Sequence, residues 1–313
     1  MLLLLCACDS VRSVAGSPVE MAQQNGKTAA IAAPHAPLWP PRTWVYWLQN
    51  MQPAELAEVS VELAVIDHAA DGRDETAYPP ETIAALQNSG KAVLCYFSIG
   101  EAENYRSYWR KEWKKNPPAF LGPENPRWKG NFKVRYWDDS WWSFVLQPYL
   151  DSIIRQGFDG VYLDIIDAYW FWHEEHGMEV ADTADRMIDL VVRIADYARK
   201  HDARVGRGRF VICPQNAEGI ISDGSKDKVA RYIDVIDAIG VESLFFNTSK
   251  EDRAYRMKLL QRFAAAGRPV LNIEYIKPSK RDEYKRMLQR NAFPVVGYIA
   301  SPDAALDKLG MQP

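Results

Sequence analysis

The sequence has few cysteines and histidines for its length, and it has no excess of basic residues. It contains four cysteines and five histidines in 313 residues, and its formal net charge is −3. So few cysteines do not indicate a disulfide framework, and the charge balance argues against the basic surface of a nucleic-acid binder. We therefore expect no nucleic-acid partner, and we expect Cys95 and Cys213, which lie in apolar runs, to be buried thiols.

Several motifs of common enzyme classes are also missing. The sequence has no Gly-x-Ser-x-Gly elbow and no paired-cysteine zinc motif, so serine-hydrolase and zinc-ribbon interpretations lack support. No Gly-rich phosphate loop follows the first apolar run, where "YWLQNMQP" stands instead, and this disfavours a doubly wound nucleotide-binding sheet. His173 and His176 are three residues apart, a spacing that indicates an exposed charged turn here more than a metal site, so we expect no metal or other cofactor.

The amino terminus carries an apolar run, "MLLLLCACDS", that is too short to span a bilayer. It resembles the hydrophobic part of a secretory signal without the usual basic start, and "LCAC" resembles a bacterial lipobox that ends at Cys8. Residues 1–8 are therefore interpreted as a signal segment, and acylated Cys8 would tether an exported cell-envelope protein to a membrane. The alternatives are a secreted protein and a chance apolar start on a cytosolic protein.

The remaining sequence divides into a linker and one large domain. Residues 9–41 are rich in Ala, Pro, Ser, Gln and Gly without an apolar period, which predicts a flexible tether before a folded domain over 42–313. Eight short apolar runs within that domain predict strands: 43–48, 63–67, 92–98, 160–165, 210–213, 237–242, 270–275 and 295–300.

Helical patterns separate most of these runs. Prolines 79 and 80 precede one helix that ends near Gly90, residues 184–200 have an amphipathic period, and Thr248 to Glu251 have the spacing of a capping box. A last short helix is expected over 301–310. Eight strands alternating with helices predict a (β/α)8 TIM barrel, an α/β fold.

Acidic residues occur at or just after the end of five predicted strands: Asp67, Glu101, Asp164, Glu242 and Glu274. In a barrel these strand ends lie on one face, where the loops form the active site, so acids far apart in sequence would converge. Like charges that are brought together raise the pKa of one partner, and one protonated plus one ionised carboxyl is what glycosidic bond cleavage requires. A helix cap or an ion pair is the alternative role for Asp67 and Glu274, and sugar positioning or helix capping is the expected role for Asp167.

Tryptophans are concentrated in one part of the chain. Eight of the eleven lie between residues 109 and 172, and the long segment 104–142 after the third predicted strand holds six of them. We expect this insertion to fold over the mouth of the barrel, with tryptophans such as Trp109 and Trp137 stacked on sugar rings. The alternative is that these side chains pack the insertion onto the barrel.

Four stretches together resemble glycoside hydrolase family 114, the endo-α-1,4-polygalactosaminidase-like barrels related to the Pel polysaccharide hydrolase domain. They are "CYFSIGEAENYR" (95–106), "GFDGVYLDIIDAYWFW" (157–172), "CPQNAEG" (213–219) and "GVESLFF" (240–246). The resemblance implies cleavage of an α-linked galactosamine or N-acetylgalactosamine polymer without a metal, with Asp164 as nucleophile or its electrostatic equivalent and Glu242 as general acid/base. The residues expected to contact the polysaccharide are Asp67, Glu101, Asp167, Gln215, Asn216, Glu274, Tyr96, Tyr162 and Trp137.

Two other functions stay open at this point. A non-catalytic polysaccharide-binding barrel would use the same cleft without turnover, since a fold does not determine its function. Metal-dependent hydrolysis would depend on His173 and His176. The oligomeric state is left open by the sequence.

Overall fold

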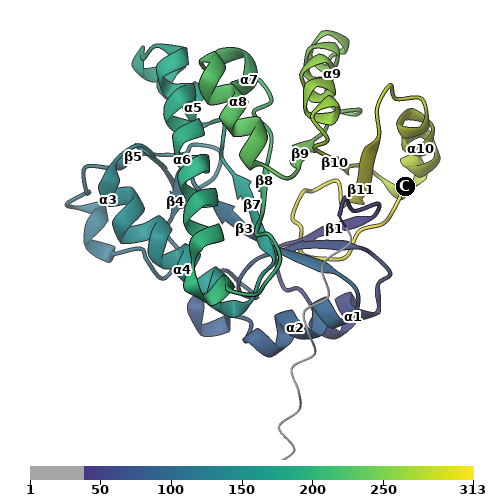
Figure 1. The fold of residues 1–313 in the computed structure, drawn as a ribbon, viewed down its shortest axis with the longest axis horizontal. Coiled ribbons are helices and arrows are strands. Elements are labelled where there is room, and N and C mark those ends of the chain that lie inside the picture. Colours follow the sequence, from purple (N-terminus) through teal and green to yellow (C-terminus); the bar gives the residue numbers. More distant parts are fainter. Residues whose placement is uncertain (1–38) are drawn as a thin grey trace, which may run out of the picture. The chain divides into compact units, whose positions relative to one another are not determined.

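The computed structural model describes residues 39–313, and its core is a parallel β-sheet surrounded by helices (Figure 1). Eight parallel strands correspond to the eight predicted runs, within two residues at each end. They are β1 (Trp44–Trp47), β2 (Leu63–Ile66), β3 (Ala92–Ser98), β7 (Gly160–Asp164), β8 (Val211–Pro214), β9 (Ile239–Glu242), β10 (Val270–Tyr275) and β11 (Val295–Ala300). The α/β fold predicted from the sequence is therefore confirmed.

The strands follow the order expected of a barrel. Five of them pair in the order β1-β2-β3-β7-β8 and three in the order β9-β10-β11, all parallel. A parallel bridge between Gln215 and Gly240 joins the two sheets. Gly240 is required there, because a Cβ atom at this position would lie 1.9 Å from the Tyr162 hydroxyl. All the parallel strand ends therefore face the same edge.

Ten α-helices are assigned within the described residues. They are α1 (Pro53–Glu58), α2 (Pro80–Asn88), α3 (Asp139–Trp141), α4 (Gln147–Gln156), α5 (Ala168–His176), α6 (Val180–Lys200), α7 (Ile220–Asp223), α8 (Lys226–Val235), α9 (Lys250–Ala265) and α10 (Arg281–Gln289). Neighbouring helices α4, α6 and α8 pack in that order, and Figure 1 shows them outside strands β3, β7 and β8. None of the helices in residues 39–313 is long and apolar enough to cross a bilayer.

The start of α9 differs in detail from the predicted capping box. Ser249, not Thr248, is the N-cap, and its hydroxyl accepts a hydrogen bond from the backbone N–H of Asp252 at 3.0 Å. The Thr248 hydroxyl instead donates to the Asp252 carboxylate at 2.7 Å. Both hydroxyls satisfy groups of the first turn, so the helix begins one residue later than the spacing predicts.

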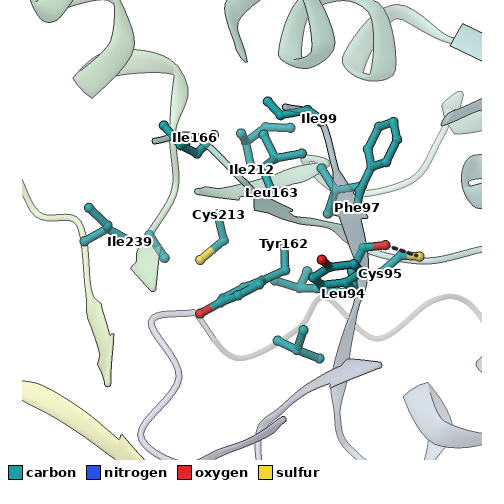
Figure 2. Close-up of a cluster of buried hydrophobic side chains, with 14 of the residues drawn as sticks. Leu94, Cys95, Phe97, Ile99, Tyr162, Leu163, Ile166, Ile212, Cys213 and Ile239 are labelled. Atoms are coloured by element: carbon teal, nitrogen blue, oxygen red, sulfur yellow. Dashed lines mark hydrogen bonds between the residues drawn. The ribbon is translucent and has the colours of Figure 1, made fainter. Parts of the chain in front are cut away.

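The core includes side chains packed between strands and helices and side chains of different strands packed on one another, such as Tyr46 of β1 and Tyr162 of β7 with ring centroids 5.1 Å apart; part of it is shown in Figure 2. Strands β2 and β3 are buried along their whole length, as the continuous apolar runs predict for a parallel sheet covered by helices. Cys95 and Cys213 are both buried and free. Figure 2 shows Cys213 beside Tyr162, whose ring is completely buried.

The insertion after β3 forms its own small sheet, which the sequence did not predict. Strands β4 (Glu101–Glu103), β5 (Leu121–Glu124) and β6 (Asn131–Val134) pair antiparallel in the order β4-β6-β5. Polar and apolar residues alternate in β4 and β6 but not in β5, and the strands are only three or four residues long. Such short segments have too weak a period to be recognised in the sequence.

The expected helix over 301–310 is wrong, because this segment is irregular. The carbonyl of Leu306 accepts hydrogen bonds from the backbone N–H groups of Leu48 at 2.9 Å and Gln49 at 3.0 Å, just after β1. Met311 exchanges two backbone hydrogen bonds with Ile299 of β11, each 2.9 Å long. The terminal segment thus bonds to both β1 and β11, and these tertiary contacts override its weak helical pattern.

Candidate active site

The first predicted catalytic acid, Asp164, ends β7 at the carboxyl edge of the sheet. The Tyr96 hydroxyl donates to Oδ2 at 2.8 Å, and the backbone N–H of Ile165 donates to Oδ1 at 2.8 Å. Ile165 has φ of 61°, a left-handed conformation that a β-branched residue rarely adopts, so the backbone turns sharply after the acid. Burial, and then the charge of Glu242, raise the pKa of Asp164 to about 8. The carboxyl is therefore protonated at neutral pH.

The second predicted acid, Glu242, ends β9 and is held by two side chains. Asn216 donates from Nδ2 to Oε2 at 2.8 Å, and its own Oδ1 accepts from the backbone N–H of Glu242 at 3.0 Å. The hydroxyl of Tyr275, the last residue of β10, donates to Oε1. Both carboxylate oxygens therefore have a donor, which fixes the orientation of the side chain.

The two acids lie in one site, because the charge of Glu242 acts directly on Asp164. Both charges also act on the hydroxyls of Tyr46 and Tyr275. Burial and then the Asp164 charge raise the pKa of Tyr46, whose hydroxyl donates to Gln215 Oε1 at 3.0 Å. The neutral hydroxyls of Tyr46, Tyr96 and Tyr275 thus lie beside the two acids at the strand ends.

A second group of charges lies next to this pair. Glu101 is fully buried, and its carboxylate accepts hydrogen bonds from Asn125 at 2.8 Å and Asn131 at 3.3 Å and pairs with Lys133 at 2.5 Å. Asp167 is exposed to solvent and does not cap α5 with its side chain, and the charges of Lys133, Glu101 and Glu242 act on it. Asp167 therefore lies near Glu242 and also near the Glu101–Lys133 pair of the insertion.

Asp67 lies in a buried ion-pair network. Arg106 donates to both of its oxygens, at 2.7 and 2.8 Å, and also to Glu103 at 2.7 Å. The ring of His68 approaches Asp67 at 2.8 Å. Burial alone would raise the pKa of Asp67, but the Arg106 charge and the hydrogen bonds from His68 and Arg106 outweigh it and lower the pKa to about 2. In this structure Asp67 anchors the insertion to the end of β2.

Glu274 is fully buried and bonds to the loop that follows β9. Its carboxylate accepts from the backbone N–H groups of Phe245 at 2.7 Å and Phe246 at 3.3 Å. Burial raises the pKa of Glu274 to about 7 against the opposing effect of these hydrogen bonds. Both Asp67 and Glu274 thus make the kind of structural contact that the sequence left open for them.

The predicted sugar-binding aromatics differ in exposure. Trp137 packs edge-on against Trp172 with ring centroids 5.2 Å apart, and Trp109 packs against Trp113 and Phe132. Two other tryptophans of the cluster project into solvent, Trp128 with 60% and Trp170 with 45% of its surface exposed. Trp109 and Trp137 are partly buried, so the most exposed indoles of the cluster are those of Trp128 and Trp170.

The two closely spaced histidines lie on α5. His173 Nδ1 lies 2.7 Å from the carbonyl oxygen of Met178, and the His176 ring packs 4.4 Å from the Trp172 ring centroid. Among residues 39–313 no three His, Cys, Asp or Glu side chains are arranged to hold a metal ion.

Sequence reasoning missed three residues around Glu242: Tyr275, Glu218 and Arg256. Tyr275 directly follows Glu274 in a predicted strand, and Glu218 lies within the stretch 213–219. Neither position carries a sequence signal that marks it as a functional residue. Arg256 lies on α9 and donates to the Glu242 carbonyl at 3.1 Å. No sequence signal distinguishes it from the other arginines of that helix.

Asp164 and Glu242 thus both end strands at the carboxyl edge of a parallel β-sheet, an arrangement that can serve as a two-carboxyl site. The sequence model of glycoside-hydrolase family GH114 matches residues 27–307, and the chain belongs to this family. Relatives match most of the chain. An uncharacterized protein of Methanocaldococcus jannaschii is 37% identical over 85% of this chain and 77% of its own length. An uncharacterized protein of Thermotoga maritima is 33% identical over 86% of this chain and 85% of its own length.

Solved structures share the fold. The glycoside hydrolase domain of PelA from Pseudomonas aeruginosa superposes with a TM-score of 0.64 at 18% identity and covers 87% of this chain and 98% of that domain. Ega3 of Aspergillus fumigatus, solved in complex with galactosamine, superposes with a TM-score of 0.59 at 21% identity. The superposition covers 84% of this chain and 92% of the Ega3 chain. Family membership and these neighbours support glycoside hydrolase activity.

Proposed function

We propose that this protein cleaves α-linked galactosamine and N-acetylgalactosamine exopolysaccharide internally, with Asp164 and Glu242 as the catalytic pair. The observation that carries the proposal is the coupling of these two carboxyls, one of which is protonated at neutral pH. A protonated and an ionised carboxyl at one mouth are what glycosidic bond cleavage needs. The galactosamine bound by Ega3, which has the same fold, supports the choice of sugar.

The charges at the mouth favour an amino sugar over a neutral one. The charges of Glu242 and Asp167 act on Asp164, and those of Glu101 and Glu242 act on Asp167. Lys133 pairs with Glu101, and its charge also acts on Asp167. An ammonium group on unacetylated galactosamine would gain Coulomb energy in this partly buried, acidic environment. A fully acetylated polymer would not, so the enzyme should prefer partly deacetylated substrate.

The same ammonium group would prepare the pair for reaction. In the free protein the proton lies on Asp164, whereas attack by Asp164 requires it as a carboxylate. A substrate cation beside Asp164 would stabilise its charged form, so Asp164 would act as a carboxylate. Glu242 would act as the general acid and donate a proton to the glycosidic oxygen while the bond from that oxygen to the anomeric carbon breaks. Asp164 would attack that carbon or stabilise its positive charge, and water would complete hydrolysis.

Sugar contacts in this proposal come from residues around the pair. Asp167 and Asn216 are at least partly exposed and would contact the sugar, whereas the buried side chains of Glu101, Tyr96 and Gln215 would position the groups that do. A longer polymer would reach the exposed indoles of Trp128 and Trp170, which suit stacking on sugar rings. Tyr162 and Trp137 would act behind these groups, because Tyr162 is buried and Trp137 is packed against Trp172.

The test is cleavage of a defined polymer by purified protein. Partly deacetylated galactosaminogalactan is incubated with wild type, Asp164→Asn and Glu242→Gln, and new reducing ends are measured. We expect each catalytic variant to lose at least about 1000-fold in kcat, as removal of a group in a catalytic unit does. Asp189→Asn, an exposed aspartate on α6, is the matched control and should keep full activity. Polymer binding without new reducing ends in wild type would favour the non-catalytic binding barrel instead.

Export with a lipid anchor on Cys8 is the second part of the proposal. Cys8 lies outside the described residues, so the apolar run before it and its lipobox-like pattern carry this part. Cells that express the full chain are fed an alkyne-tagged fatty acid, and Cys8→Ser is compared with Cys6→Ser. Label that is lost only in Cys8→Ser supports the anchor, and equal labelling of both variants or none in wild type refutes it.

A further inference from the structure

Arg256 of α9 connects the backbone of Glu242 to the neighbouring loop after β8. Its Nη1 donates to the Glu242 carbonyl oxygen at 3.1 Å, and its Nε donates to Glu218 Oε1 at 2.9 Å. Nη2 pairs with the same carboxylate at 2.8 Å. Only 16% of the Arg256 side chain and 7% of the Glu218 side chain are exposed, so the pair is largely shielded from water.

The two loops that Arg256 joins have strained backbones. Asn216 and Ala217 follow β8 with φ of 59° and 55°, and Ser243 follows Glu242 with φ of 50°. Residues with a Cβ atom rarely adopt this left-handed conformation, and they keep it only where the surroundings hold them. Asn216 is also the residue that bonds to the Glu242 carboxylate, so the position of this loop sets the position of the acid.

We infer that Arg256 and Glu218 form a clamp that positions Glu242 for catalysis by joining the loop 215–219 to the end of β9. The inference rests on the proposed function, because it assigns a role to Glu242. Arg256 fixes the acid from its backbone carbonyl, whereas Asn216 and Tyr275 fix it from its carboxylate. Neither member of the clamp bonds to the carboxylate itself, so both are positioning residues.

The same helix provides a matched comparison. Arg262, also on α9, donates to the backbone carbonyl of Ile221 at 3.1 Å, the same kind of bond at the same length. Ile221 lies in α7, which follows the loop 215–219. A substitution of Arg262 therefore removes an arginine-to-carbonyl bond from the same helix while both bonds of Arg256, to Glu242 and to Glu218, stay in place.

The test compares kcat, KM and melting temperature on partly deacetylated galactosaminogalactan. The variants are Arg256→Lys, the double variant Arg256→Met with Glu218→Gln, and Arg262→Met. The double variant removes both charges together, so it leaves no unpaired buried carboxylate and reports on geometry. We expect kcat to fall about 10- to 100-fold with KM within about twofold, since small displacements of a catalytic group have such effects. Arg256→Lys should recover part of kcat, and Arg262→Met should keep wild-type kcat at a similar loss of melting temperature.

A kcat of the double variant within twofold of Arg262→Met would overturn the clamp. Wild type that does not cleave the polymer would instead refute the proposed function, and a crystal structure of the double variant then decides about the clamp. The Glu242 carboxylate should leave Asn216 and Tyr275 in that structure. A carboxylate that keeps both partners would overturn the inference without any measurement of turnover.

Discussion

Replacing Asp164 with asparagine should make stability less dependent on pH. Burial and the charge of Glu242 raise the pKa of Asp164 from 3.8 to about 8. In the unfolded chain this carboxyl ionises near its ordinary value, so the folded state holds an extra proton between about pH 4 and pH 8. Stability that depends on this proton is complete below pH 4 and falls as the pH rises to 8. Asparagine is neutral at every pH and has nearly the shape of the protonated acid.

The structure sets the size of this effect. A rise of about four pKa units corresponds to about 6 kcal/mol at about 1.4 kcal/mol per unit. Asp164 is partly exposed, so this figure is an upper limit and we expect about 3 kcal/mol. For a chain of this size, that difference corresponds to roughly 6 to 12 °C in melting temperature.

The assay is thermal unfolding of wild type and Asp164→Asn at several values between pH 5 and pH 8. The difference between the melting temperature of the variant and that of wild type should increase steadily in favour of the variant as the pH rises. Asp189→Asn, on the surface of α6, should follow the wild-type curve in parallel. A constant difference between Asp164→Asn and wild type across this range would refute the reasoning, because Asp164 would then not retain its proton on folding.

Three further predictions follow from the buried and exposed groups around the site. Glu274→Ala leaves two buried backbone N–H groups without an acceptor, so urea denaturation should show a loss of about 2 to 4 kcal/mol, and Glu274→Gln a smaller loss. Arg106→Ala leaves the Asp67 carboxylate buried without its partner and should lower the free energy of unfolding by about 3 to 5 kcal/mol, whereas a loss under about 1 kcal/mol would contradict the buried network. Trp128→Ala should change the free energy of unfolding by less than about 0.5 kcal/mol but raise KM for long polymer. Trp109→Ala should lower the free energy of unfolding by about 3 kcal/mol and leave kcat and KM unchanged. The reverse pattern would show that the packed indole of Trp109 is the one that binds sugar.

The site could be predicted in part, because the position of an acid in a strand can be read from the chain whereas its partners cannot. Asp164 and Asp67 look alike in sequence, since each follows a short apolar run. In the structure Asp67 accepts a hydrogen bond from Arg106, which lies 39 residues away in sequence, and the pKa of Asp67 falls to about 2. Asp164 is buried near the acid Glu242, and the pKa of Asp164 rises to about 8. The opposite results depend only on which charge folding brings close.

The sequence alone determined the eight strands and the edge at which the acids lie. Continuous apolar runs must be buried on both faces, and in parallel strands the carboxyl ends share one edge, so local pattern is enough for both. The run beginning at Asp237 shows the limit, because the strand starts only at Ile239. The Asp237 carboxylate instead bonds to the backbone N–H of Ile212 at 2.8 Å and to Arg199 at 2.7 Å.

Only the tertiary structure decided which groups surround Glu242, which tryptophans are exposed, and what the terminal segment does. Each of these depends on contacts between residues far apart in sequence: 26 residues separate Asn216 from Glu242, and Leu306 bonds to Leu48 across nearly the whole domain. Local propensities differ by less than about 1 kcal/mol per residue for such segments. One or two long-range hydrogen bonds are enough to override them, so the final arrangement follows from the packing of the whole chain.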